Sequence, residues 1–311
     1  MLKVRIWLLK GLLWLLSRLP LCVHYVLGGF VAWLMGSVFR YRRKVVEHNL
    51  ELCFPEKSEQ ERKAIRRGFY RHLGEVIGEA VWFGGCHNAQ RLHRQRLVES
   101  ENPEEVAALL AAAPNLVLLS SHCGNWELHG GVASYSYDGK PAPLTEQNYV
   151  VVYREQTSKV WDKVLHDNRI APLEDPKHYE GLVETNDIIR YILRHKDEQK
   201  IYDFRTDQRP YKTSQANIPV QFLGQQVYTM TGAAGIAHKF GWPVAFLSMR
   251  RERRGHYKLR YVTICTDASK MSIEDIMQQY YTLLEKDIRE QPETNLWTHR
   301  RFARHKNFKT Q

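Results

Sequence analysis

Cysteine is scarce and scattered in this sequence. Its five cysteines form no CxxC pair, which disfavours a disulfide framework and a zinc site and favours a reducing compartment. The chain also lacks the GxGxxG and P-loop motifs that cradle nucleotide phosphates, and it lacks the HExxH spacing of zinc hydrolases. We therefore expect chemistry that needs neither a metal ion nor a cofactor.

Acidic side chains are outnumbered, because 34 aspartates and glutamates face 45 lysines and arginines, for a formal net charge of +11. Such a balance favours acidic partners, namely nucleic acid, anionic lipid or an acidic protein. Patterns typical of helix-turn-helix, RRM or zinc-finger domains are absent, so we expect no nucleic-acid partner. Internal repeats and low-complexity linkers are absent too, which favours one soluble domain.

Charge is missing altogether from residues 19–39. As a helix this segment is about 30 Å long, which matches the apolar core of a bilayer. Residues 1–17 are also largely apolar, so the N-terminus could be one tilted span or an interfacial helix followed by a span; a pair of buried core helices is the alternative. The basic cluster at 40–44 predicts that the rest of the chain faces the cytoplasm. We expect a membrane-anchor helix within 1–44 and a folded domain at 45–311.

The periodicity of apolar residues predicts helices and strands in alternation. Helices are expected at about 58–83, 103–112, 156–168, 184–195, 229–240 and 273–290, and a further one ends near 134. Strands are expected at about 115–121, 150–153, 200–204, 219–222, 243–249 and 257–265. Residues 40–58 are predicted to be a polar connector. This order is typical of an α/β fold, here a single domain with a central mixed β-sheet flanked by helices.

The most informative stretch is HCGNWE at 122–127. It follows an apolar run that indicates a buried strand, so His122 lies where the strand ends and Glu127 where a helix begins. Such a pair can act as a general base with an orienting carboxylate, and the base would take a proton from a hydroxyl. The alternative is a histidine at a surface turn and a glutamate placed at a helix start to match the helix dipole.

Other chemistry at this motif is also open. Cys123 could act as a covalent nucleophile, although adjacent residues in a strand face opposite sides, which separates it from His122. Gly124 and Asn125 are expected to present backbone N–H groups at the helix start, where they would suit an oxyanion or a phosphate. An ordinary helix-capping role for Asn125 is the alternative.

Polar and charged residues follow the next two predicted strands. Arg154 could bind a substrate phosphate through both arms of its guanidinium, or it could be a solvated charge. Asp207 and Gln208 could position a substrate, or Asp207 could form a structural ion pair. Arg169 is a weaker candidate for phosphate binding.

Six segments, in order along the chain, carry a family pattern. They are RKVVEHNLELCFP at 43–55, HCGNWE at 122–127, VYR at 152–154, DQ at 207–208, FLG at 222–224 before a Thr/Gly-rich helix, and WTHRRF at 297–302. Together they resemble the bacterial lipid A late acyltransferases over nearly the whole chain. Glu127, the last residue of the HCGNWE motif, resembles the lipid A acyltransferases in this position, whereas the related glycerolipid acyltransferases usually have aspartate there. Arg209-Pro210 departs from the pattern, so the acceptor could differ from the best-known one.

This resemblance implies a glycerol-phosphate-acyltransferase-like fold and an enzyme of the bacterial inner membrane whose catalytic domain faces the cytoplasm. It implies transfer of a fatty acyl chain from acyl carrier protein to a hydroxyl of a lipid A precursor. His122 is implied as the general base and Glu127 as its orienting residue, with no covalent enzyme intermediate. The implied partners are acyl carrier protein, the lipid acceptor and an anionic membrane surface.

Several alternatives stay open in the sequence. The acceptor could be a glycerolipid, an aminolipid or a glycolipid, and the donor could be a coenzyme A thioester. The chain could also be a non-catalytic, membrane-anchored lipid carrier or scaffold. Acyl chain length depends on how a pocket packs, which residue patterns do not reveal.

Overall fold

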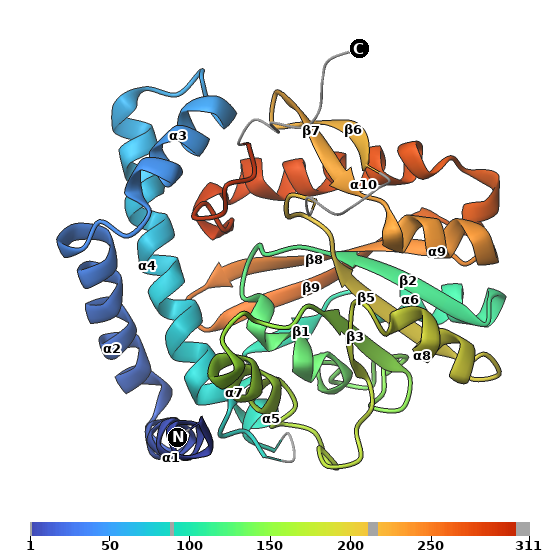
Figure 1. The fold of residues 1–311 in the computed structure, drawn as a ribbon, viewed down its shortest axis with the longest axis horizontal. Coiled ribbons are helices and arrows are strands. Elements are labelled where there is room, and N and C mark those ends of the chain that lie inside the picture. The colour runs from blue at the N-terminus through green and yellow to red at the C-terminus, as the bar shows by residue number, and fades with distance from the viewer. Residues whose placement is uncertain (1, 88–89, 211–216, 303–311) are drawn as a thin grey trace.

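A seven-stranded sheet forms the centre of the molecule in the computed structural model, which describes residues 2–87, 90–210 and 217–302 (Figure 1). Its strand order is β1-β9-β8-β2-β5-β3-β4. The strands are β1 (Val98–Ser100), β2 (Asn115–Ser120), β3 (Tyr149–Tyr153), β4 (Leu182–Glu184), β5 (Lys200–Arg205), β8 (Val244–Arg253) and β9 (His256–Cys265). Neighbours pair in parallel except β8 and β9, which form an antiparallel hairpin. The predicted α/β fold with a central mixed sheet is confirmed.

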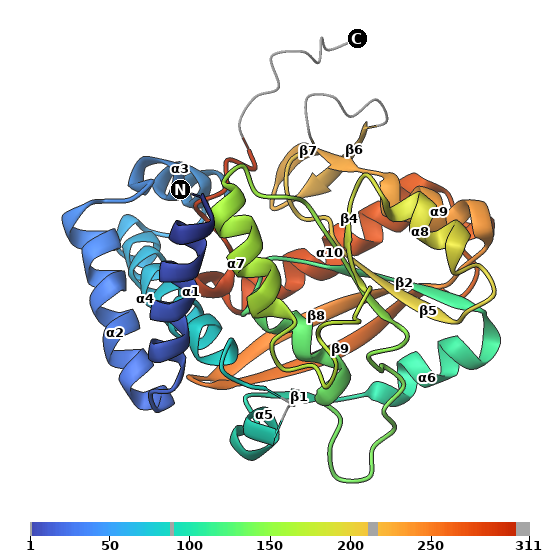
Figure 2. The ribbon, with the colours of Figure 1, turned by 60° about the horizontal axis from the view of Figure 1, so that its bottom comes forward.

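Helices cover both faces of this sheet, as the two views in Figure 1 and Figure 2 show. After the first two helices of the chain, which are described below, the helices are α3 (Arg43–Cys53), α4 (Glu59–Phe83), α5 (Gln90–Gln95), α6 (Pro103–Ala112), α7 (Lys159–Arg169), α8 (Ile188–Arg194), α9 (Gly232–Phe240) and α10 (Ile273–Glu290). In β2, Leu116 and Leu118 belong to one buried core, while Val117 and Leu119 belong to the other. Because both of its faces are covered, β2 has a continuous apolar sequence.

Two predicted elements are wrong. The connector predicted at 40–58 contains α3, because Val46 and Leu50 bury one side of a helix whose other side is charged. The helix predicted at 229–240 begins only at Gly232. The residues before it belong to strand β7 (Gln225–Met230), which pairs with β6 (Asn217–Phe222) in a separate hairpin.

Two helices make up the N-terminal part of the chain. They are α1 (Leu2–Ser17) and α2 (Leu21–Trp33), and α2 continues as a π-helical turn at Leu34–Val38. In the described part of the chain, the stretch from Leu21 to Val38 is the one helix that is long and apolar enough to cross a membrane, judged by length and composition. Pro20 precedes α2 and separates it from α1.

Both N-terminal helices pack against the rest of the protein. α2 runs beside α4 (Figure 1), and the two backbones approach so closely that a Cβ added to Gly28 would lie 2.3 Å from the carbonyl oxygen of Gly74. α1 lies beside α7 (Figure 2). The division into an anchor at 1–44 and a domain at 45–311 stays a prediction.

Candidate active site

Two parallel strands bring the candidate residues to one edge of the sheet. β2 and β5 are neighbours, with Ser120 opposite Arg205, and the N–H of Thr206 donates to the carbonyl of Ser120 at 3.3 Å. Parallel strands end at the same edge of a sheet, where α/β proteins commonly bind their ligands. The segments 121–122 and 206–208 therefore meet there.

His122 is paired with a carboxylate at this edge. Its Nδ1 lies 2.7 Å from Oδ1 of Asp207, and the two side chains are only 17% and 11% exposed. A carboxylate only accepts hydrogen bonds, so Nδ1 carries the proton and Nε2 is the basic nitrogen. The Trp126 ring packs edge-on against the imidazole, with ring centroids 5.4 Å apart, and Nε2 of Gln208 lies 3.3 Å from Nε2 of His122.

The surroundings keep the partner of His122 ionised. Burial acts to raise the pKa of Asp207, but the charge and hydrogen bond of His122 outweigh it and hold that pKa below its ordinary value. An ionised Asp207 can fix the orientation of the imidazole and stabilise the imidazolium that forms when Nε2 takes a proton. Burial also lowers the pKa of neighbouring His299 to about 4, so that ring is neutral near pH 7.

Glu127 does not make the contact with His122 that its spacing predicts. Nε and Nη2 of Arg169 each donate to its carboxylate at 3.0 Å, and Nε1–H of Trp126 donates to the same group at 3.1 Å. Although burial acts in the other direction, Arg169 lowers the pKa of Glu127 to about 2. The structure differs from the prediction for two reasons. The pairing of β2 with β5 places the Asp207 carboxylate beside the imidazole, and the buried guanidinium of Arg169 binds the Glu127 carboxylate.

The two arginines predicted to bind substrate occupy different environments. Arg169 is only 8% exposed, and its guanidinium is bound to Glu127, so the structure shows it in an internal ion pair and not open to a phosphate. Arg154 lies one residue beyond β3, which is the parallel neighbour of β5, and it is exposed at the same edge as His122. Its binding role stays a prediction.

The backbone N–H groups of Gly124 and Asn125 are satisfied within the protein, contrary to the expectation. The Gly124 N–H donates to the carbonyl of Thr294 at 3.2 Å, and the Asn125 N–H points to Sδ of Met249 at 3.2 Å. Gly124 has φ of +66°, and a Cβ there would lie 2.6 Å from the Met249 carbonyl oxygen, so the turn requires glycine. Asn125 instead caps the 3-10 helix Trp126–Ser134.

A buried carboxylate that the sequence did not single out supports this motif. Glu79 of α4 accepts hydrogen bonds from Nδ2 of Asn125 at 2.7 Å, from the hydroxyl of Tyr25 at 2.9 Å and from the hydroxyl of Tyr257 at 2.8 Å. Burial raises its pKa. Its place among the apolar positions of a helix is the one signal in the sequence that could have identified it.

The Cys123 thiol has the properties of a structural group. It is 3% exposed, and burial raises its pKa well above the ordinary value. Its Sγ lies 3.6 Å from Oδ1 of Asn295. Because the thiolate is the reactive form, a buried protonated thiol is a poor nucleophile.

Comparisons with known proteins agree over almost the full length of the chain. The model of the family described as bacterial lipid A biosynthesis acyltransferase matches residues 1–304. The lipid A biosynthesis lauroyltransferase of Escherichia coli (strain K12) is 25% identical over 299 residues, which cover 95% of this chain and 90% of the relative. The lipid A biosynthesis palmitoleoyltransferase of the same organism and the lipid A biosynthesis acyltransferase of Shigella flexneri are each 22% identical over 300 residues, with the same coverage.

Proposed function

The chain belongs to the bacterial lipid A biosynthesis acyltransferase family, and on that premise we propose that it transfers a fatty acyl chain from an acyl carrier protein thioester to a hydroxyl of a lipid A precursor. The observation that supports this most directly is the pair of His122 and Asp207, a base of the kind that hydroxyl acylation needs. The relatives are named for the same class of reaction.

The proposed reaction uses His122 twice. Its Nε2 takes the proton of the acceptor hydroxyl while the oxygen attacks the thioester carbonyl, and Asp207 stabilises the imidazolium. When the tetrahedral intermediate collapses, the C–S bond breaks and His122 returns the proton to the leaving thiolate. The products are an ester and the free thiol of the carrier, and no enzyme-bound acyl intermediate forms.

We propose an indirect role for Glu127. Its carboxylate holds both Arg169 and the indole N–H of Trp126. The Trp126 ring in turn packs on the imidazole of His122. Glu127 thus fixes the ring that confines His122, while Asp207 makes the contact with Nδ1.

Gln208 and Arg154 are the proposed substrate contacts. The amide of Gln208 lies beside Nε2 of His122, where the acceptor hydroxyl must arrive. Arg154 is exposed at the same edge of the sheet, and a guanidinium can bind an acceptor phosphate through two hydrogen bonds.

We propose attachment to the cytoplasmic face of the inner membrane through α1 and α2. Both helices expose large apolar side chains, for example Trp7 of α1 and Val26 of α2, each 73% exposed. α2 is packed along α4, where Arg71 is exposed, so a crossing α2 would carry this charge into the apolar layer. We therefore propose that α2 lies at the membrane surface. The formal charge of +11 suits both an anionic membrane and an acidic carrier protein.

A transfer assay tests the proposal. Labelled acyl chains are offered on acyl carrier protein, and in parallel on coenzyme A, to a lipid A precursor, a glycerolipid and an aminolipid. Wild-type protein is expected to label the lipid A precursor from the carrier protein, and His122→Ala to lose roughly 100- to 10,000-fold in rate. His178→Ala is the matched control, because that exposed histidine pairs with Asp175 away from the site.

Each result has a distinct meaning. Label on another lipid would keep the chemistry and change the substrate. Full activity of His122→Ala would remove His122 as the base. No transfer from folded, membrane-bound wild-type protein would favour a lipid carrier or scaffold.

A further inference from the structure

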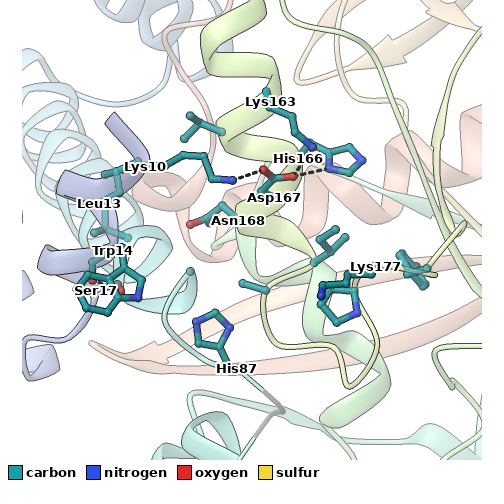
Figure 3. Close-up of a pocket in the computed structure, with 17 residues that line it drawn as sticks. Lys10, Leu13, Trp14, Ser17, His87, Lys163, His166, Asp167, Asn168 and Lys177 are labelled. Carbon is teal, nitrogen blue, oxygen red and sulfur yellow. Dashed lines mark hydrogen bonds and ion pairs between the residues drawn. The ribbon is translucent and has the colours of Figure 1, made fainter. Parts of the chain in front are cut away.

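A cavity of about 530 Å³ lies between α1 and α7 (Figure 3). Lys10 and Trp14 line it from α1, and Lys163 and His166 line it from α7. Lys177 comes from the loop that follows α7. The volume is in the range of ligand-binding pockets, and none of the residues that line the cavity belongs to the proposed catalytic set.

Positive charge is in excess on the wall of this cavity. Nζ of Lys10 and Nζ of Lys163 each lie 2.8 Å from the carboxylate of Asp167, and Nδ1 of His166 lies 3.2 Å from it (Figure 3). Asp167 is the one carboxylate among the described lining residues, and Lys177 is exposed with no side-chain partner in the described part of the chain. Three lysines against one carboxylate leave two positive charges uncompensated.

The other walls of the cavity are largely apolar. Leu13 comes from α1, Val164 from α7, and Ile170 from the residue after α7. On its outer side α1 exposes Trp7 and Leu12, which belong to the proposed membrane face. Basic side chains next to apolar walls, beside a helix at a membrane surface, suit an amphiphile with a negative head group.

We propose that this cavity binds the phosphate head group of an anionic phospholipid from the membrane that α1 contacts. Lys163 and Lys177 bind the phosphate oxygens, and the acyl chains lie along the exposed side of α1. The lipid is a ligand of the fold and takes no part in acyl transfer. Because α7 ends at Arg169, the ion-pair partner of Glu127, a bound lipid also steadies the helix that holds the active-site motif.

Photo-crosslinking tests this site. Full-length protein in a non-ionic detergent is mixed with phosphatidylglycerol that carries a photoreactive group beside its glycerol, and the labelled peptides are mapped by mass spectrometry. We expect label on peptides that span 10–17 and 163–171. Lys163→Gln/Lys177→Gln should reduce this label by roughly tenfold.

A matched pair removes the same charge elsewhere. Lys159→Gln/Lys270→Gln changes two lysines that pair with Glu155 and Asp267 outside the cavity, and its labelling should equal that of wild type. An equal fall in both double variants would overturn the proposal, because general surface charge would then explain the binding.

Two further arms separate the possible ligands. Equal labelling by the corresponding zwitterionic phosphatidylcholine would overturn the choice of an anionic lipid. Loss of label on adding inorganic phosphate at the concentration of the probe would show a site for free phosphate and would overturn the lipid. His122→Ala should be labelled like wild type, so this result is independent of the transfer assay.

Discussion

The imidazole of His122 takes its carboxylate partner from the segment that follows another strand, 85 residues further along the chain. Spacing within the HCGNWE motif favours Glu127, because a glutamate at a nearby helix start can reach back to the end of a strand. Spacing cannot reveal that β5 lies beside β2 and delivers Asp207 to Nδ1. Nor can it reveal that Arg169 binds Glu127 with two hydrogen bonds.

Replacing each of the two carboxylates by its amide, in separate variants, distinguishes the role of Asp207 from that of Glu127. Asp207→Asn removes the negative charge that stabilises the imidazolium, so we expect kcat for acyl transfer to fall roughly 100- to 10,000-fold. Glu127→Gln should lower kcat less and melting temperature more, because it leaves the buried guanidinium of Arg169 without its ion pair. Asp187→Asn, an exposed carboxylate paired with Arg190, is the control. The opposite ranking of kcat would restore Glu127 as the orienting residue.

His299 gives the protein a measurable sensitivity to acid. Its folded-state pKa of about 4 lies below the ordinary value of 6.5, so the unfolded chain takes up the proton first. The stability that follows is complete above pH 6.5 and is lost as pH falls towards 4, to a total of about 3 kcal/mol. Thermal unfolding between pH 7.5 and 4 measures it. His299→Gln should flatten this part of the profile, and an unchanged slope would contradict the assignment.

At the scale of elements, glycine allows the backbones of α2 and α4 to approach closely. A Cβ on Gly28 would meet the backbone of Gly74 at 2.3 Å, whereas one on its neighbour Gly29 would meet nothing within 4 Å. At this contact α2 therefore requires glycine at position 28 and has room for a Cβ at position 29.

Two alanine substitutions test this contact. Gly28→Ala should destabilise the protein by about 1–3 kcal/mol, because the backbones must separate. Gly29→Ala should be neutral or should stabilise by up to about 1 kcal/mol, because alanine favours helix. Melting temperature in detergent measures both. Equal effects would show that α2 is not packed on α4.

Elements with strong local signals were predictable. Ser58 and Glu61 form a capping box, and α4 begins at the next residue after that serine. β2 could be identified because both of its faces are buried. The edge strands β1 and β4 were not predicted, since three residues are too few to show a period. β7 was missed because Thr229 and Met230 precede a helix-forming stretch, and only their pairing with β6 makes them a strand.

At the scale of the whole molecule, the apolar surfaces of α1 and α2 are the proposed contact with the membrane. Loss of two apolar side chains from α1, in Trp7→Ser/Leu12→Ser, removes roughly 2–4 kcal/mol of apolar contact and should weaken vesicle binding by roughly 30- to 1,000-fold. Flotation with vesicles measures the bound fraction. Ile189→Ser/Leu193→Ser on α8 is the control, since both side chains are exposed and α8 lies on the opposite side of the molecule from α1 (Figure 1). Full retention of the α1 variant would show that α2 crosses the membrane.

The candidate site was predictable in its membership more than in its contacts. His122, Asp207 and Gln208 could each be identified as polar residues that follow an apolar strand, and the structure brings them together. Their partners depend on strand order, which residue patterns do not contain. The sequence marks Glu79 only as a carboxylate among apolar helix positions, and it does not reveal the three donors, which come from separate parts of the chain.

The hydrogen bonds of Glu79 also predict how removal of the N-terminal helices would affect the loop beside His122. Its three donors are Tyr25 from the N-terminal helices, Tyr257 from β9 and Asn125 from the loop beside His122. A fragment that begins at residue 45 would keep every proposed catalytic residue and yet lose the Tyr25 donor. Such a fragment is therefore a poor substitute for the whole protein in inhibitor screening, because a cut at residue 45 removes part of the support of the loop beside His122.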